Sequence, residues 1–234
     1  YIIKKMSSAE VIGSGKYGTV YKVCMDSGCK KKVARKNSPS NLGFEYRIMK
    51  LLHGIAPDGI VKPIDYKKTD TKNTLYLEFI NINNKNRIYS VEKVKKILKE
   101  VITTLLKIQN RYPSFRHNDL HWENIFNSKD NKKILVGDLG FANIQVNGFK
   151  NPQVQRGDYI QSHGIGPKPN LKYDIAFLLN DIHLRGDPNV KNFIKKIVPK
   201  EYLELENSKV TNGRMRYNVD HSKFPSLNKI LYKL

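Results

Sequence analysis

The chain has 234 residues, of which 39% are apolar, and carries a formal net charge of +21. A chain of this length buries roughly 70% of its unfolded surface, so it can build a sizeable core. No stretch approaches the ~18 consecutive apolar residues that a membrane-spanning helix needs, and the first residues lack the apolar run of a signal peptide. We therefore expect an intracellular protein, in the cytoplasm or nucleus, without a membrane span.

The positive charge favours acidic partners, among them nucleic acid, chromatin and acidic protein substrates. Most of the excess is lysine, and asparagine and isoleucine are also abundant, so A/T-rich codon use alone would give this composition. The lysines are spread along the chain rather than gathered in one block. The sequence is therefore compatible with nucleic-acid binding but does not specifically indicate it.

Residues 10–36 predict three strands. The first leads into Gly13-Ser14-Gly15-Lys16-Tyr17-Gly18, and residues 19–23 then alternate between apolar and polar as a half-buried strand does. A dinucleotide-binding fold would place a helix directly after such glycines. The β-branched and aromatic residues predict a strand instead. We therefore expect a strand–turn–strand whose glycines let backbone amides approach phosphate oxygens.

Cys24 and Cys29 flank Asp26-Ser27-Gly28, a predicted hairpin turn that could bring the two thiols face to face. Two cysteines with no histidine nearby do not form a zinc site. Because disulfides are rare inside cells, we expect reduced thiols.

The third strand covers residues 32–36 and ends at Ser38-Pro39-Ser40. Strand alternation puts Ala34 and Lys36 on one face and Arg35 on the other. Residues 30–32 are also lysines, so the register that selects Lys36 is one of several.

Residues 41–53 predict a helix with Ser40 as its N-cap. Glu45 is the only glutamate between the third strand and the next one. Residues 60–64 and 74–79 predict two further strands. The first 80 residues are thus expected to form five strands and one helix.

Residues 80–89 are polar and irregular and predict a linker. Ser90 is the expected N-cap of a long amphipathic helix that reaches about Arg111. Residues 141–172 are rich in glycine, proline and asparagine and predict a long loop, a feature usually associated with function. An apolar helix is expected from Tyr173 to about residue 184, and shorter helices over 193–198 and 227–231.

Three residues between the long helix and this loop indicate the chemistry. Asp119 precedes Asn124 by five residues, and Asp138 follows Asn124 by fourteen at the end of an apolar run. Phosphoryl transfer uses one carboxylate to orient the nucleophile, and an amide with a second carboxylate to hold magnesium. A lone aspartate would more often cap a turn, but the ordered set favours this chemistry.

The spacing of Asp119, Asn124 and Asp138, together with the glycine turn and Val33-Ala34-Arg35-Lys36, resembles that of the protein kinase superfamily. The resemblance implies an α+β, two-lobed protein-kinase-like fold over residues 1–234. The N-lobe would be a five-stranded antiparallel sheet with one helix, over residues 1–80. The compact and mainly helical C-lobe would cover 81–234.

The resemblance also implies ATP and Mg²⁺ as cofactors, with ATP between the lobes. Asp119 would be the catalytic base, Asn124 and Asp138 the metal ligands, and Lys36 the phosphate-binding lysine held by Glu45. The Lys36–Glu45 gap is shorter than in most protein kinases, so either the connection is trimmed or Glu45 is not the partner. The residues implied in ATP binding are Ile12, Gly13, Ser14, Gly15, Gly18, Val20, Ala34, Lys36, Leu77 (at the gatekeeper position), Glu78, Ile80, Asn124 and Asp138.

Two departures from the kinase pattern bear on regulation. Asn118 replaces the arginine that normally answers an activation-loop phosphate, and no Ala-Pro-Glu occurs between Gly140 and Asp174. We therefore expect activity that does not depend on phosphorylation of that loop. Asp174 resembles the aspartate that accepts backbone amides of the catalytic loop.

His121 stands where serine/threonine kinases usually carry a lysine that touches the transferred phosphate. His-x-Asp-Leu-His resembles both haspin-type protein kinases and phosphotransferases of the aminoglycoside and choline type, and Trp122 favours haspin. Compact, A/T-biased kinases also resemble those of large DNA viruses, which would place the protein in a host cell or virion. The expected function is phosphorylation of serine or threonine in a protein. A small-molecule phosphotransferase and a catalytically inactive binding module are the alternatives.

Overall fold

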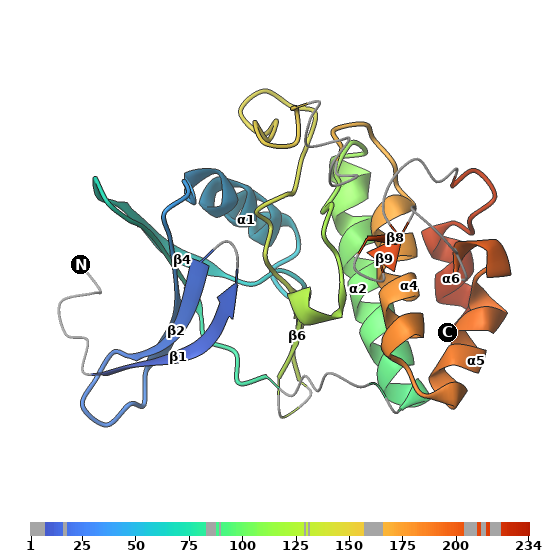
Figure 1. The fold of residues 1–234 in the computed structure, drawn as a ribbon, viewed down its shortest axis with the longest axis horizontal. Coiled ribbons are helices and arrows are strands. Elements are labelled where there is room, and N and C mark those ends of the chain that lie inside the picture. The colour runs from blue at the N-terminus through green and yellow to red at the C-terminus, as the bar shows by residue number, and fades with distance from the viewer. Residues whose placement is uncertain are drawn as a thin grey trace.

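The computed structural model describes residues 8–15, 18–82, 88, 90–128, 130, 132–156, 166–203, 210–211, 214–215 and 221–234. A five-stranded antiparallel sheet and helix α1 form one part of the molecule, and a mainly helical part lies beside it (Figure 1). The predicted α+β, two-lobed architecture is confirmed. No helix among the described residues is long and apolar enough to cross a membrane.

The sheet has the order β1-β2-β3-β5-β4. Its strands are β1 (Ser8–Gly15), β2 (Gly18–Cys24), β3 (Lys32–Ser38), β4 (Pro63–Lys68) and β5 (Asn73–Glu78). The prediction of a strand over 60–64 was wrong in its position. Ile60 and Val61 are buried, and instead of pairing with β5 they pair with Val136, on the strand that leads into Asp138.

The two faces of the sheet differ in what they contact. Val23, Val33 and Tyr76 form a small apolar cluster on one face, and Arg35 covers the Tyr21 ring there at 4.8 Å. Because β-strand side chains alternate, Ala34 and Lys36 lie on the opposite face. The predicted alternation in β3 is therefore confirmed.

The glycine-rich segment is a strand–turn–strand, as predicted, with Gly15 paired to Gly18. Residues 16–17, at its tip, lie outside the described residues. Gly18 has φ +139°, and a Cβ there would lie 2.1 Å from the Asn37 carbonyl oxygen. Only glycine fits that backbone position.

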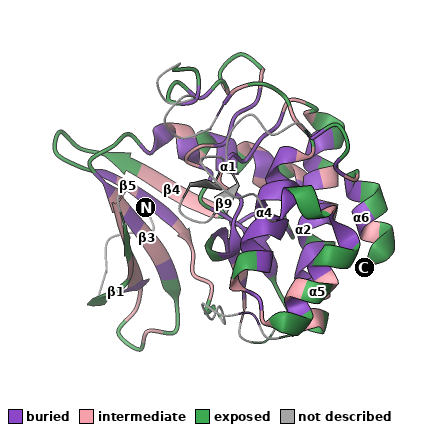
Figure 2. Cartoon of the chain, turned by 45° about the vertical axis from the view of Figure 1, so that its right-hand side comes forward, coloured by how far each residue is buried: buried purple, intermediate pink, exposed green. Residues whose placement is uncertain are grey.

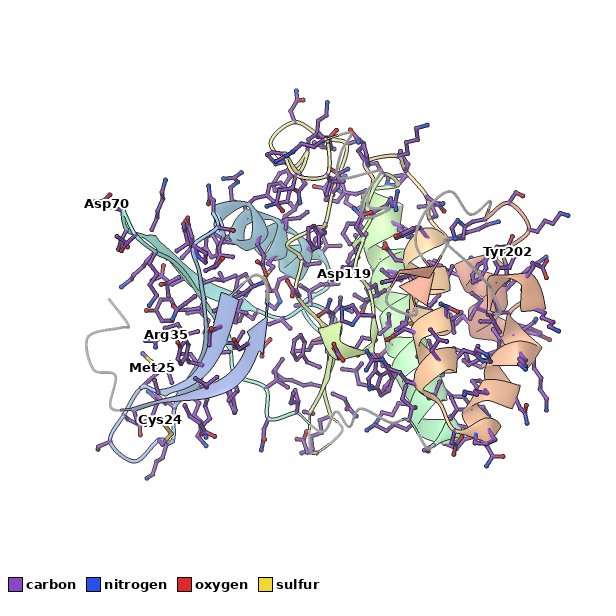
Figure 3. All side chains as sticks on the ribbon, viewed as in Figure 1. Cys24, Met25, Arg35, Asp70, Asp119 and Tyr202 are labelled. Atoms are coloured by element: carbon purple, nitrogen blue, oxygen red, sulfur yellow. A yellow bond between two sulfur atoms is a disulfide. The ribbon has the colours of Figure 1, made fainter. Side chains whose placement is uncertain are left out.

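Cys24 and Cys29 are joined by a disulfide, so the expectation of reduced thiols was wrong for this structure. The turn between them brings their Cα atoms to 4.7 Å, within the range that a disulfide spans. Figure 3 shows Cys24 at the end of the sheet remote from Asp119.

Helix α1 (Gly43–Ile55) begins two residues later than predicted. Ser40 is not its cap: the Asn41 side-chain oxygen accepts a hydrogen bond from the Gly43 amide at 2.8 Å instead. The N-cap position itself is held by Leu42, which has no side-chain capping hydrogen bond, and Asn41 precedes it.

Helix α2 (Val91–Arg111) has the predicted bounds, and the Ser90 side chain accepts from the Lys93 amide as its N-cap. Helix α4 (Tyr173–Arg185) also matches the prediction. Helix α5 (Pro188–Ile197) starts earlier than expected, because Asp187 caps it and Pro188 occupies its first turn. Helix α6 (Leu227–Lys233) follows.

The short elements are β6 (Ile125–Asn127), β7 (Ile134–Val136), β8 (Val210–Thr211), β9 (Arg214–Met215), and the 3₁₀ turns η1 (Trp122–Asn124) and η2 (Lys200–Tyr202).

One apolar core runs from α1 through α2 and β7 to α4, α5 and α6. Figure 2 shows buried residues on the inward faces of these helices and exposed residues on the outer faces of α5 and α6. The linker predicted over 80–89 is described only in part: Ile82 pairs with Ser128, and Ile88 with Gly186. Of the long loop over 141–172, residues 157–165 lie outside the described residues.

Replacing Ile102, which is fully buried in α2, with alanine should lower the free energy of unfolding by ~2–5 kcal/mol through lost burial and a cavity. Lys99→Ala on the exposed face of the same helix is the matched control and should change stability by less than ~0.5 kcal/mol. Denaturant titration of both variants measures the difference, and equal effects would contradict the assignment of the buried face.

Candidate active site

Asp119, His121 and Asn124 lie on the loop that joins α2 to β6, and Figure 3 shows Asp119 between the sheet and the helical part. Buried Asp174, in the first turn of α4, holds this loop. Its carboxylate oxygens accept the His117 amide at 2.8 Å and the Asn118 amide at 2.9 Å. The amide hydrogen bonds predicted for Asp174 are thus present. Burial raises the pKa of the Asp174 carboxyl, although His117, Arg116 and the two amides oppose that rise.

Asp181, one further residue of α4, anchors the next part of the loop. It accepts the Trp122 amide at 2.9 Å and the Arg185 Nε at 3.0 Å, and Arg185 also pairs with Glu123 at 2.9 Å. The sequence reading missed Asp181. The signal was present, because two aspartates seven residues apart in an apolar helix lie two turns apart on one face.

His117, the first residue of His-x-Asp-Leu-His, received no role from the sequence, and it links the two carboxylate-bearing segments. The ring is fully buried. Its Nδ1 accepts the Asp119 amide at 3.3 Å, which leaves Nε2 to donate to the Gly137 carbonyl at 3.1 Å; this tautomer is assigned from the hydrogen bonds. The loop of Asp119 is therefore tied to the residue that precedes Asp138.

Asn124 strengthens the same link. Its side-chain amide donates to the Asp119 backbone carbonyl at 2.8 Å, and the Asn124 backbone carbonyl accepts the Gly137 amide at 3.0 Å. The two predicted metal ligands, Asn124 and Asp138, therefore belong to neighbouring segments joined by a hydrogen bond. A carboxylate and an amide oxygen suit Mg²⁺, which keeps several waters and needs few protein ligands. The described residues contain no group of three or more His, Cys, Asp or Glu side chains placed to hold a metal.

His121 lies almost buried against this pair, with 7% of its surface accessible. Its Nε2 is 3.2 Å from the Asn124 amide nitrogen and 3.6 Å from an Asp119 carboxylate oxygen. Its Nδ1 faces Glu123 at 3.9 Å, beyond hydrogen-bond distance. The imidazole therefore lies beside both Asp119 and Asn124.

Lys36 stands opposite these residues, on β3. Its ammonium contacts both Glu45 oxygens at 3.0 Å and an Asp138 oxygen at 2.9 Å. Lys36 and Glu45 are buried, whereas the Asp138 side chain is 47% accessible. The sequence left open whether Glu45 is the partner of Lys36, and in the structure the two are in contact.

Because one ammonium lies between two carboxylates, the pKa values of all three groups are shifted. Burial lowers the pKa of Lys36, but Glu45 and Asp138 outweigh it, so the pKa is raised and the lysine stays charged. For Glu45, which lies deepest, desolvation dominates and its pKa is raised. Desolvation also acts to raise the pKa of Asp138, yet the attraction of Lys36 and its hydrogen bond leave that pKa lowered. The greater accessibility of Asp138 is consistent with a lowered pKa for Asp138 and a raised pKa for Glu45, because a solvated carboxylate costs less to ionise.

The backbone at Asp138 has φ +54°, a conformation that few residues other than glycine adopt. Asn118, beside Asp119 on the facing loop, has φ +67°. Unfavourable backbone conformations of this kind persist where the surrounding contacts hold them, and they cluster at functional sites.

Four of the predicted site residues line a single cavity of about 290 Å³, namely Lys36, Glu45, Asp119 and Asp138. Asn124 and His121 contact Asp119 but are not among the residues that line the cavity. The cavity extends along the start of α1 and the segment after Asp138. Its other lining residues are Ser38, Ser40, Asn41, Leu42, Phe44, Gly140, Phe141, Asn151, Pro152 and Gln153.

Apart from Lys36, the residues of the sheet that are implied in adenine and phosphate binding do not line this cavity. Val20 is the cross-strand partner of Lys36, and Ala34 is the partner of Leu77, so these four share one face. Gly13 pairs with Val20, while Ser14 and Gly15 pair with Thr19 and Gly18 at the turn. Ile12 is 47% exposed at an irregularity in β1. Ile80 follows the end of β5.

The Glu78 side chain does not point toward this face. It accepts the Lys62 amide at 2.8 Å and pairs with Lys133 at 3.1 Å. Only the backbone of Glu78 is therefore suited to contact a ligand on the face that carries Ala34 and Leu77.

Side-chain amides hold the segment that follows Asp138. Asn118 donates to the Phe141 carbonyl at 2.9 Å, and Asn151 donates to the carbonyls of Gly140 and Ala142 at 2.8 and 3.1 Å. Asn143 in turn accepts the Asn151 amide at 2.9 Å. The sequence analysis treated Asn143 and Asn151 as loop composition and Asn118 as a replaced arginine, and it missed the network.

Comparison with known proteins agrees with this geometry. The family described as "Protein kinase domain" matches residues 6–161. R400 of Acanthamoeba polyphaga mimivirus, provisionally named as a serine/threonine-protein kinase, is 24% identical over 161 residues, which are 54% of this chain and 34% of R400. The chain thus spans about a third of the length of that relative.

A solved structure, that of the Cydia pomonella granulovirus kinase PK-1, is similar over 59% of this chain and 55% of PK-1, with a TM-score of 0.46 and 20% identity. The family match alone covers more than half of the chain. The chain therefore belongs to the protein kinase domain family.

Proposed function

We propose that the protein transfers the γ-phosphate of ATP, with Mg²⁺, to serine or threonine in a protein substrate. The observation that carries this proposal is the convergence of Lys36, Glu45, Asp119 and Asp138 on one cavity. A cation for the phosphates, a carboxylate for the metal and a second carboxylate for the acceptor hydroxyl are the parts that phosphoryl transfer uses.

Each residue has a distinct role in the proposal. Lys36 binds the α- and β-phosphates and is held in place by Glu45, while Asn124 and Asp138 bind Mg²⁺. The metal neutralises charge that develops on the phosphate oxygens. Asp119 accepts a hydrogen bond from the acceptor hydroxyl and takes its proton. Two hydrogen bonds support this role, because they fix the backbone that carries the carboxylate: the Asp119 amide donates to His117 Nδ1, and the Asn124 side chain donates to the Asp119 carbonyl.

His121 is proposed to contact the transferred phosphate. Its Nε2 lies 3.6 Å from an Asp119 carboxylate oxygen, so the imidazole stands beside the group proposed to orient the acceptor hydroxyl. It would then substitute for the lysine that many serine/threonine kinases use at this position.

We further propose that activity does not require phosphorylation of the segment after Asp138. Because residue 118 is asparagine, a phosphate on the segment after Asp138 would lack the usual arginine partner. The neutral contacts of Asn118, Asn143 and Asn151 hold the described part of that segment instead. These contacts carry no charge, so they form without a modification.

Two other functions remain alternatives. A small-molecule phosphotransferase for cationic substrates would be expected to present acidic residues near the cavity, but Glu45, Asp119 and Asp138 are its only lining carboxylates among the described residues, and all three are used above. A binding module without activity would not require the lysine, both carboxylates and the amide together. The experiments below separate the three functions.

Asp138→Asn should reduce phosphoryl transfer at least ~100-fold, because it removes the charge that holds the metal while it preserves shape. The measurement is transfer of radiolabelled γ-phosphate to a mixture of acidic, basic and histone proteins. Exposed Asp58→Asn is the matched control and should retain wild-type transfer. Equal transfer by Asp138→Asn and wild type would overturn the assigned role. Transfer to choline or an aminoglycoside but to no protein would favour the small-molecule alternative.

A second prediction concerns pH. Lys36 lowers the pKa of Asp138, so their attraction stabilises the fold above the ordinary aspartate pKa and is lost as the pH falls through the lowered value. The stability of the wild type relative to Lys36→Met should therefore decrease over that acidic range. Thermal unfolding of both proteins across pH measures this, with Lys50→Met as the control for loss of an exposed charge. A difference between wild type and Lys36→Met that does not vary with pH would contradict the proposed pairing.

The third prediction tests independence from phosphorylation. Protein made in bacteria and treated with phosphatase should transfer phosphate at the rate of untreated protein. Asn151→Ala should lower that rate roughly tenfold, because two backbone carbonyls after Asp138 lose their donor. Asn110→Ala, on the exposed face of α2, should leave the rate unchanged. Loss of activity on phosphatase treatment would refute this part of the proposal.

A further inference from the structure

An open groove of about 1020 Å³ lies between α5 and α6, in a part of the fold separate from the cavity at Lys36. Six of its lining residues are lysines, and no carboxylate is among the described residues that line it. The lysines are Lys172, Lys195, Lys196, Lys223, Lys229 and Lys233. Figure 2 shows α5 and α6 side by side with exposed outer faces.

Three lysines elsewhere in the structure are paired with acids: Lys22 with Glu10, Lys95 with Glu92, and Lys133 with Glu78. The groove gathers lysines from two helices and two loops around one space, and no aspartate or glutamate is among the described residues that line it.

Two of the lysines also build the groove. Lys172 donates to the carbonyls of His221 and Ser222 at 3.0 and 2.8 Å, which ties the start of α4 to the loop before α6. Lys233 donates to the carbonyls of Lys196 and Ile197 at 3.3 and 3.2 Å, at the end of α5. These contacts fix the walls while leaving the ammonium charges inside the groove.

The exposed chemistry of the groove indicates the kind of ligand. The apolar residues beneath it, Ile197, Val198 and Phe224, are each only 2% exposed, so they offer no pocket for an apolar peptide anchor. The rest of the lining consists of lysines, serine hydroxyls, the Asn228 amide, the partly exposed Pro199 and Pro225, and one aromatic ring. That ring belongs to Tyr232, which is 93% exposed at the rim.

We propose that this groove binds single-stranded nucleic acid. Ammonium groups from both walls neutralise backbone phosphates, and the Tyr232 ring stacks on a base. A cationic groove combined with an exposed aromatic side chain is the arrangement that sequence-independent single-strand binding uses. Lysine suits this role because it acts as a point charge toward phosphate. This site is independent of the proposed phosphoryl transfer.

The test is fluorescence anisotropy with a labelled 15-residue oligodeoxythymidine, titrated with the full chain at several salt concentrations. The variant Lys196→Gln/Lys223→Gln/Lys229→Gln should bind at least ~10-fold more weakly at low salt. The slope of log K against log[salt] should fall in magnitude by ~2, since each phosphate contact on a single strand contributes ~0.7. Lys50→Gln/Lys67→Gln/Lys68→Gln removes the same charge from exposed positions of α1 and β4 and should retain wild-type binding. Equal weakening by the two triple variants would overturn the proposal in favour of diffuse charge.

Tyr232→Ala gives a second test that does not alter charge. Its ring is exposed, so the fold should be unaffected, and the loss of stacking should weaken single-strand binding about tenfold. Binding of a DNA duplex should not change, because its bases are already stacked. Unchanged single-strand affinity in this variant would contradict the stacking role. A glutamate-rich peptide that binds the groove more tightly than the oligonucleotide, and loses binding in the groove triple variant alone, would assign the groove to an acidic protein instead.

Discussion

The site depends on one ammonium group shared between two carboxylates. Lys36 lies on the sheet, Glu45 on α1 and Asp138 at the end of β7, so this contact joins three separate elements. A buried lysine without partners would be costly, and the two carboxylates compensate for its burial. Because Asp138 is the more accessible of the two and keeps its charge most easily, it is the one available to a metal ion. The same contact therefore shapes the fold and sets the electrostatics of the cavity.

The other wall is held by buried groups that never enter the cavity. Asp174 and Asp181 on α4 bind backbone amides of the loop that carries Asp119, and His117 ties that loop to the segment of Asp138. These hydrogen bonds tie the loop to α4 and to the segment of Asp138, and so restrain its backbone. The catalytic carboxylate proposed here thus rests on a frame of hydrogen bonds rather than on its own contacts.

Much of the fold and the core of the site could be predicted from the sequence, because the signals were local. Alternation gave the face of Lys36, and the spacing of Asp119, Asn124 and Asp138 selected the residues that the structure gathers. Asp181, His117 and Asn151 were missed, since their roles arise from contacts between segments that only folding brings together. The position of β4 was wrong for a related reason: an apolar run does not tell whether its residues pair in the sheet or, as at Ile60, with β7. The hydrogen bond of Asn41 at the start of α1 and the disulfide at Cys24 likewise depended on geometry that composition does not determine.

The central claim is that Lys36 couples Glu45 to Asp138 and so assembles the nucleotide site. A double-mutant cycle tests it most directly, with the affinity of Mg-ADP measured calorimetrically for wild type, Glu45→Gln, Asp138→Asn and the double variant. The account predicts that the double variant loses less binding free energy than the sum of the two single losses, since either change already disrupts the shared contact. Strictly additive losses would show that the two carboxylates act independently, and would contradict the account.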